Sequence, residues 1–247
     1  MRLAPVMASL LLFTGAVPAV AEPTEVMIRA IAADAKFIGT SMGGMAITLR
    51  DARSGEVLAT GTTTGGTGNT AAIMDATGRS PARGGADAAG FLATIDIDEP
   101  TLVELAVEGP LGRPASAVRA MAQRWIMPGE DVTIGDGWVV EMTGIVITSA
   151  VGLSGRTVSL TPQIELLCGC PITPDGPWKA SDYAVTASLW QEGARIARTE
   201  LEFSQSPGGF SGVLWAPAPG RFRLSIHARN RLTGNSGVVS STVSVTE

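Results

Sequence analysis

The sequence predicts an all-β protein built from two antiparallel β-sandwich domains in tandem. Short segments with alternating or β-branched apolar residues recur along the chain, as half-buried strands require. Clusters of turn-forming residues separate these segments, and the chain holds 30 Gly and 15 Pro. No segment keeps a helical period over four turns, and residues 115–123 come nearest to one.

The first residues predict an export signal. Arg2 supplies a positive n-region, an apolar run follows, and Ala19-Val20-Ala21 has the small-x-small form that signal peptidase cleaves. We therefore expect residues 1–21 to be removed and the mature protein to be periplasmic or secreted. No later segment approaches the ~20 consecutive apolar residues of a membrane span, so we expect no membrane span after cleavage.

An N-terminal β-sandwich domain is predicted over residues 22–151. In residues 101–108, Val103, Leu105 and Val107 form an apolar set that we expect to face the core, with the alternate positions facing solvent. The predicted strands of this domain are residues 25–32, 45–50, 56–60, 90–97, 101–108, 120–127, 131–134 and 138–151.

A C-terminal Ig-like β-sandwich domain is predicted over residues 152–247. Pro162 confines its first strand to an edge or a bulge, and Gly193 supplies the positive φ that a tight hairpin turn needs. The predicted strands are residues 157–168, 183–191, 194–203, 210–215, 220–230 and 237–245.

Two stretches resemble known domain families. Residues 45–61, MAITLRDARSGEVLATG, resemble the strand–turn–strand that opens transthyretin-like and carboxypeptidase-regulatory-like domains. Residues 219–230, PGRFRLSIHARN, together with the turn and strand that follow, are similar to the last hairpin of immunoglobulin-like and fibronectin type III-like domains. These resemblances imply sandwich folds, which carry many different functions.

Composition and charge narrow the function. A net charge of −5 and the absence of a basic run argue against a nucleic-acid partner. His227 is the only histidine, so it would have to serve any Ser/His/acid triad, and Ser211 lacks the Gly-x-Ser-x-Gly context of a nucleophile elbow. The sequence favours a non-catalytic protein, while paired carboxylates of the glycosidase kind leave the question of catalysis open.

The motif Leu167-Cys168-Gly169-Cys170-Pro171 is the most distinctive feature of the sequence. In an extended strand both sulfurs would lie on one face, and two soft thiolates suit Cu(I). The pair resembles the Cys-x-Cys of an Ig-like copper chaperone for cytochrome oxidase, although this chain lacks that family's aromatic flanks and membrane anchor. A thiol–disulfide exchange pair and a static disulfide in an oxidising compartment are the alternatives.

Aromatic residues follow the two cysteines. Trp178 and Tyr183 predict a partner-docking surface, because Trp and Tyr are enriched at interface hot spots. The alternative is that Trp178 covers the end of a sandwich. Met42 and Met45 allow thioether ligation of copper or, as methionine more often does, filling of a core gap.

The sequence therefore predicts an exported, non-catalytic binding or accessory module that docks on another exported or envelope protein. The alternative function is a Cu(I) chaperone or thiol-redox protein that uses Cys168 and Cys170. The sequence establishes no cofactor, and Cu(I) is the candidate that this alternative implies. A carbohydrate-binding role would require exposed aromatic side chains in a groove.

Overall fold

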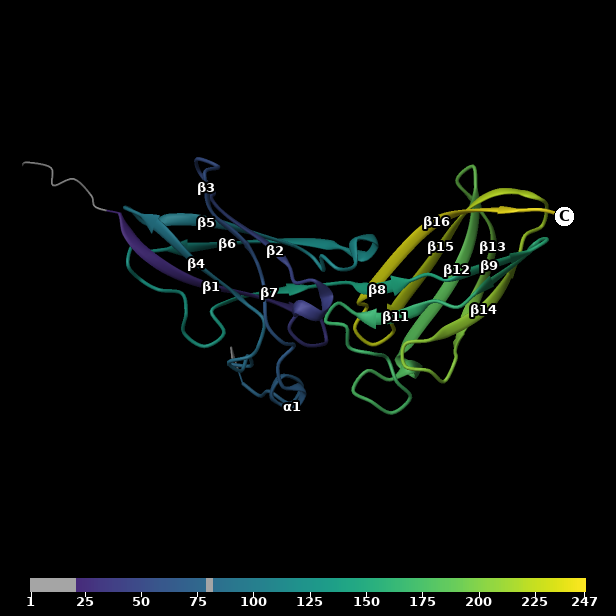
Figure 1. The fold of residues 1–247 in the computed structure, drawn as a ribbon, viewed down its shortest axis with the longest axis horizontal. Helices are drawn as coiled ribbons and strands as arrows, with labels where there is room; N and C mark the ends of the chain where they lie inside the picture. The colour runs from purple at the N-terminus through teal and green to yellow at the C-terminus, as the bar shows by residue number, and fades with distance from the viewer. Residues whose placement is uncertain (1–20, 79–81) are drawn as a thin grey trace, which may run out of the picture.

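The computed structural model describes residues 21–78 and 82–247 (Figure 1). The chain is all-β, as predicted, and residues 1–20 of the expected export signal lie outside the described residues. The strands are β1 (Glu22–Ala32), β2 (Ala46–Asp51), β3 (Val57–Thr62), β4 (Phe91–Ile97), β5 (Thr101–Gly109), β6 (Val118–Ile126), β7 (Trp138–Met142), β8 (Ile145–Thr148), β9 (Val151–Ser154), β10 (Thr157–Leu160), β11 (Gln163–Leu166), β12 (Tyr183–Gln191), β13 (Ala194–Phe203), β14 (Phe210–Trp215), β15 (Gly220–Asn230) and β16 (Ser236–Val245). The helices are α1 (Thr70–Met74) and three short 3₁₀ helices at Thr40–Met42, Pro114–Ser116 and Ala180–Asp182.

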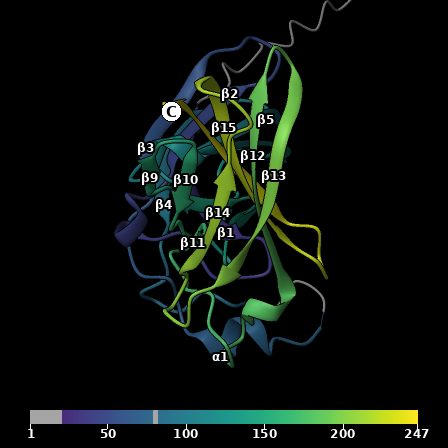
Figure 2. The ribbon, with the colours of Figure 1, turned by 90° about the vertical axis from the view of Figure 1, so that its right-hand side faces the viewer.

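These strands form four sheets. The first half of the chain contains the sheet β4-β1-β7 and the sheet β3-β2-β5-β6, and the second half contains the pair β11-β8 and the sheet β16-β15-β12-β13-β14-β10-β9. Neighbouring strands are antiparallel except β1 and β7, which are parallel. In Figure 1 the two halves lie end to end, and Figure 2 looks onto the second half with β12, β13 and β15 towards the viewer.

The chain passes from the first two sheets to the other two through a short connection, residues 143–144. All strands up to Met142 belong to the first two sheets, and all strands from Ile145 onward belong to the other two. The predicted domain limits, 22–151 and 152–247, refer to independently folding units and stay a prediction.

Alternation in the sequence places the core as expected. Val103, Leu105 and Val107 of β5 are all fully buried, and the facing β1 buries Val26 and Ile28 in the same way. Burying such side chains contributes roughly 1.5–3 kcal/mol each relative to exposure. One cluster of buried side chains continues through both halves of the molecule, so the connection between them is packed.

Three predicted strands differ from the structure. The predicted strand 138–151 is broken between β7 and β8, because the backbone of Gly144 bonds to a side chain instead of a neighbouring strand. The predicted strand 157–168 is broken at Pro162, which has no N–H for the ladder. The predicted strand 131–134 is only an isolated bridge at Val132, and Ile134 is 92% exposed.

The turn between β2 and β3 matches the strand–turn–strand resemblance. Asp51 accepts hydrogen bonds from the backbone N–H groups of Arg53 and Ser54 at 2.6 and 3.0 Å. These bonds, the one from Ser54 first, hold the pKa of Asp51 below its usual value because they favour the charged carboxylate. Gly55 closes the turn with a φ of 76°, where a residue with a Cβ is strained.

Candidate functional site

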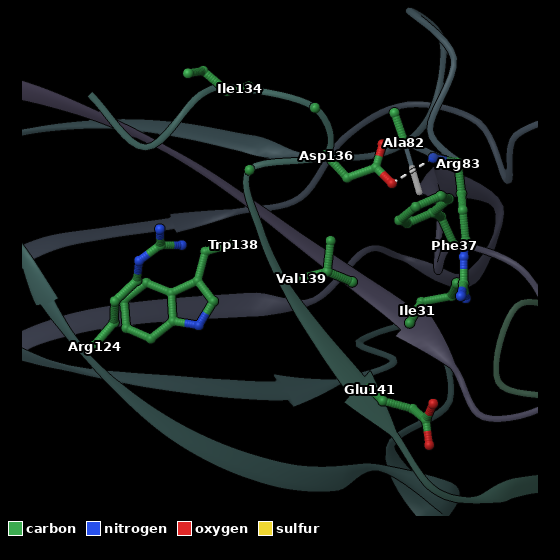
Figure 3. A pocket seen from close by; sticks show the side chains of 12 residues that line it. Ile31, Phe37, Ala82, Arg83, Arg124, Ile134, Asp136, Trp138, Val139 and Glu141 are labelled. Carbon is green, nitrogen blue, oxygen red and sulfur yellow. Dashed lines mark hydrogen bonds between the residues drawn. The ribbon is translucent and has the colours of Figure 1, made fainter. Parts of the chain in front are cut away.

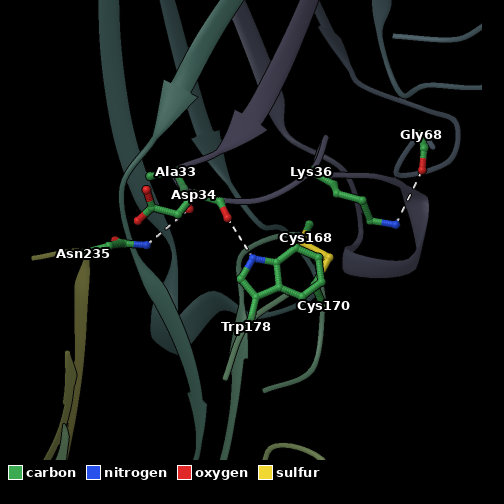
Figure 4. The surroundings of a disulfide bond; sticks show 8 residues. All are labelled: Ala33, Asp34, Lys36, Gly68, Cys168, Cys170, Trp178 and Asn235. Carbon is green, nitrogen blue, oxygen red and sulfur yellow. Dashed lines mark hydrogen bonds between the residues drawn. A yellow bond between two sulfur atoms is a disulfide. The ribbon is translucent and has the colours of Figure 1, made fainter. Parts of the chain in front are cut away.

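Cys168 and Cys170 form a disulfide in a tight turn, not in a strand (Figure 4). β11 ends at Leu166, whose carbonyl accepts a hydrogen bond from Gly169 N–H at 2.8 Å. Gly169 has a φ of 76°, so the strand geometry expected from the sequence is wrong. The turn reverses the chain at Gly169, and this reversal brings the two sulfurs together.

The cysteine turn is buried against the first half of the chain. Cys168 is 2% exposed and Cys170 is 5% exposed. A Cβ built on Gly169 would lie 2.8 Å from the sulfur of Met42, so the absence of a side chain at Gly169 lets the Met42 thioether pack against this turn. Met42 and Met45 are both buried, as core methionines are.

We call the place where the two halves of the chain pack together the junction. Trp178 lies there, over the cysteine turn (Figure 4). Its side chain is 9% exposed, and its indole N–H donates to the carbonyl of Asp34 at 2.7 Å. Tyr183 is 3% exposed, and its hydroxyl has no hydrogen-bond partner among the described residues. Both residues thus offer little side-chain surface in this state, and a partner-docking role for them stays a prediction.

Burial also controls the ionisation of Tyr183. Removal of its hydroxyl from water raises the pKa of Tyr183 because the phenolate is poorly solvated there. The carboxylates of Asp34 and Asp182 raise the pKa further, and the Asn230 side chain opposes the shift without forming a hydrogen bond in this geometry. Tyr183 therefore behaves as a neutral part of the packed junction.

Asn235 bridges the two halves from the turn before β16. Its side-chain oxygen accepts from Gly144 N–H at 2.8 Å, and its amide donates to the carbonyls of Gly144 at 3.2 Å and Ala33 at 3.5 Å. Further links across the junction are the ion pair of Arg113 with Glu165 at 3.2 Å and the bond from Ile147 N–H to the Ser116 hydroxyl.

A cavity of about 560 Å³ lies on the outer side of β7 in the first half (Figure 3). Asp136 at its rim accepts from the backbone N–H groups of Arg83 and Gly84, both at 2.6 Å, so this carboxylate holds the adjacent loop in place. Arg124 lies beside Trp138 at the other end of the cavity. The twelve described residues that line it include no Ser, Thr, Cys or His.

Exposed apolar side chains gather on a different surface, the outer face of β5 and β6. Trp125 is 58% exposed and Met121 is 55% exposed. In register across the strand pair, Leu102 lies opposite Trp125 and Ala106 lies opposite Met121. We call these four residues the β5–β6 face. The alternation of residues 101–108 correctly predicted that Leu102 and Ala106 face away from the core. Sequence reasoning did not single out Met121 and Trp125, although the alternation within residues 120–127 places both on one side.

Within the described residues, no three His, Cys, Asp or Glu side chains are grouped so that they could hold a metal ion. None of the described helices has the length and apolar character needed to cross a bilayer.

No known protein family matches this chain, and no curated protein is similar to it in sequence. Solved structures with partial similarity include a DUF3823 family protein from Bacteroides ovatus ATCC 8483, with 9% identity, a TM-score of 0.34, and 90% of this chain and 100% of that chain covered. A "putative carbohydrate binding protein" from Bacteroides uniformis ATCC 8492 has 9% identity, a TM-score of 0.32, and 89% and 98% coverage. The chicken interferon gamma receptor alpha chain has 10% identity, a TM-score of 0.35, and 93% and 100% coverage. Similarity at this level assigns no family, ligand or partner to this chain.

Proposed function

We propose that this protein is an exported, non-catalytic binding module that docks on another exported protein through the β5–β6 face. The single observation that carries the proposal is the exposure of Trp125 and Met121 on the outer face of a regular sheet. Aromatic residues and methionine are enriched at the centres of protein interfaces. Large apolar side chains that are grouped on a protein surface commonly mark an interaction site, whereas single exposed ones are ordinary.

The arrangement of the β5–β6 face suits a protein partner. The apolar pairs Leu102–Trp125 and Ala106–Met121 alternate along the strands with the polar pair Glu104–Gln123. The Gln123 amide donates to the Glu104 carboxylate at 3.4 Å. This polar pair separates the apolar anchors and provides further groups for specific recognition, as interfaces with a few dominant anchors require.

Site-specific cross-linking tests this proposal. With a photo-reactive amino acid at position 125, expressed in the organism that makes the protein, we expect a cross-link to one exported protein. The same amino acid at Val213, which is 56% exposed on β14 in the second half of the chain, should give no cross-link. With both proteins purified, Trp125→Ala should weaken binding at least tenfold, because truncation of a central aromatic anchor typically costs about 2 kcal/mol or more.

Two results would contradict docking on a different protein. One is a cross-link between two copies of this chain, together with a dimer in light scattering that Trp125→Ala dissociates. The other is unchanged affinity of the Trp125→Ala variant for the cross-linked protein. If the photo-reactive amino acid at position 125 instead cross-links to a neutral oligosaccharide, the β5–β6 face binds carbohydrate and the docking proposal is wrong.

The Cu(I)-binding alternative is favoured by one specific observation, the position of Met42. The Met42 thioether packs against Gly169, between the two cysteines. When a thiol reductant opens the disulfide, two thiolates and one thioether are available in the same buried place. Soft sulfur ligands of this kind prefer Cu(I). A Cu(I) chaperone or thiol-redox role therefore requires reduction of Cys168 and Cys170 first.

Native mass spectrometry of the reduced protein, with and without Cu(I) supplied as its acetonitrile complex, tests this alternative. We expect one copper per chain, lost in Cys168→Ser and Cys170→Ser. Met42→Leu should weaken copper binding about tenfold, which corresponds to ~1.4 kcal/mol. Met45→Leu is the matched control, because its buried sulfur lies near Gly109 and not at the cysteine turn.

A purely structural bridge gives a different result. The reduced protein would then take up no copper, and reduction would lower the free energy of unfolding by about 1–2 kcal/mol, as expected for a very short closed loop. This outcome would remove the metal-binding alternative.

A further inference from the structure

Five exposed arginines lie on the outer face of β13 and β15 in the seven-stranded sheet, and all but Arg229 lie towards one end of these strands. Arg221 and Arg223 lie on β15, and Arg195 and Arg198 lie on β13. All four are exposed. We call these four residues the arginine face, which lies in the other half of the chain from the β5–β6 face.

Strand alternation explains why these arginines share one face. On β15 the buried residues Phe222, Leu224 and Ile226 alternate with exposed or half-buried polar residues. Across the sheet, Trp190 of β12 is in register with Arg223 on one side and with Arg195 on the other. In the next row, Ser188 is in register with Ser225 and with Arg198. Side chains in one row point to the same side of a sheet.

The arginine face forms no ion pair with any of the described residues. Neither of the two ion pairs in the described part of the chain includes Arg195, Arg198, Arg221 or Arg223. No hydrogen bond from their guanidinium groups forms within these residues either, so their N–H donors face solvent. Four unpaired cations in this region contrast with a net charge of −5 for the whole chain. Such a surface attracts anions.

Trp190 positions two of the guanidinium groups. The guanidinium carbon of Arg223 lies 5.6 Å from the centroid of the Trp190 ring, and that of Arg195 lies 5.9 Å from it. The ring itself is fixed, because its N–H donates to the Ser225 hydroxyl at 2.7 Å. Cation–π contacts at these distances reduce the freedom of the arginines, so less conformational entropy is lost when they bind a ligand.

A hollow of about 430 Å³ lies beside the arginines. Hydroxyl groups and two cations line it together with the indole and the imidazole. Its lining residues are Thr186, Ser188, Trp190, Arg195, Arg198, Ser225, His227 and Val238. On the neighbouring β16, Ser240 and Thr242 are in register with Ser225 and Arg223, which extends the row of hydroxyl groups.

Three acidic residues border the arginine face. Glu200 of β13 lies opposite Thr186 of β12, and the exposed Glu202 follows two residues later on β13. Both are on the side of the hollow away from Arg195 and Arg223. Glu192, in the β12–β13 turn, lies next to Trp190 and Arg223. An anionic ligand is therefore favoured beside Arg195, Arg198 and Arg223, between Glu192 at one end of the hollow and Glu200 at the other.

We propose that the arginine face and its hollow bind an acidic polysaccharide, with carboxylate or sulfate groups on Arg195, Arg198 and Arg223 and sugar hydroxyls on Ser and Thr. Arginine donates paired N–H bonds to such planar or tetrahedral anions. The many hydroxyls match a sugar better than a lipid surface, which would require protruding apolar side chains. They also match a sugar better than single-stranded nucleic acid, which requires several free aromatic platforms.

Titration calorimetry with the full mature chain tests the proposal. The probes are an oligogalacturonate, its neutral methyl ester and a dextran sulfate oligosaccharide of similar length. We expect one or both acidic probes to bind, and the methyl ester to bind at least tenfold more weakly than the galacturonate if the carboxylate is the anion recognised. Affinity should fall as salt is added. Arg195→Gln/Arg223→Gln should lose at least tenfold in affinity, and Trp190→Phe should lose severalfold.

A matched double variant controls for total charge. Arg50→Gln/Arg119→Gln removes two exposed arginines from the first half and should leave binding unchanged. Unchanged affinity of Arg195→Gln/Arg223→Gln would overturn the proposal, as would binding of neither acidic probe. Equal or tighter binding of oligo-dT or of phosphatidylglycerol vesicles would overturn it in favour of nucleic acid or membrane. The single variant Arg198→Gln should also weaken binding of the acidic probes, and the proposal holds when both variants lose affinity and these competitors bind poorly.

Discussion

Trp178→Ala is expected to lower the free energy of unfolding by about 3–5 kcal/mol, the usual cost of truncating a large buried aromatic side chain. Trp178 is 9% exposed, and its indole N–H reaches across the junction to the carbonyl of Asp34 at 2.7 Å. The substitution removes a large apolar contact and a hydrogen bond at the same time. Urea denaturation monitored by circular dichroism measures the effect.

Trp125 provides the matched control for this prediction. Its side chain is 58% exposed, so Trp125→Ala should change the free energy of unfolding by about 0.5 kcal/mol or less. Trp178→Phe should retain most of the packing and lose mainly the hydrogen bond, about 1 kcal/mol. Equal stability of Trp178→Ala and Trp125→Ala would show that Trp178 does not support the junction.

Asn235→Ala is expected to lower the free energy of unfolding by about 2–4 kcal/mol. Asn235 is 8% exposed, and its side chain satisfies both the N–H and the carbonyl of Gly144. Alanine leaves these two buried backbone groups without partners, and each such group costs about 1–3 kcal/mol. The midpoint and slope of the urea transition measure this loss.

Ser236→Ala controls for changes at the same turn, since Ser236 is the exposed neighbour of Asn235. We expect it to alter stability by about 0.5 kcal/mol or less. If Asn235→Ala is no more destabilising than Ser236→Ala, water replaces the amide at Gly144 and the junction does not depend on this side chain.

Much of the fold was predictable because a sheet with one buried face imposes a period of two on the sequence. The buried set Val103, Leu105 and Val107 follows directly from that period. Breaks in the strands were harder to predict. The break at Pro162 had a local signal, since proline lacks an N–H. The break at Gly144 had none, because it depends on a hydrogen bond to the side chain of Asn235, 91 residues away.

The candidate sites show the same limit. Trp178 and Tyr183 suggested a docking surface by residue type, but the structure buries both. Trp125 and Met121 are exposed on a strand whose alternation looks ordinary in sequence. Burial depends on which strands and loops pack against a residue, and local sequence does not contain that information.

The sequence by itself determined the all-β class, most strands and the facing of β5, because these depend on local alternation and turn chemistry. Only the tertiary structure decided which residues share a surface. Arg195 and Arg198 are separated in sequence from Arg221 and Arg223, so no basic run appears. They share one face because β12 pairs with β13 on one side and with β15 on the other. Long-range strand pairing, rather than composition, therefore creates the cationic face of an acidic protein.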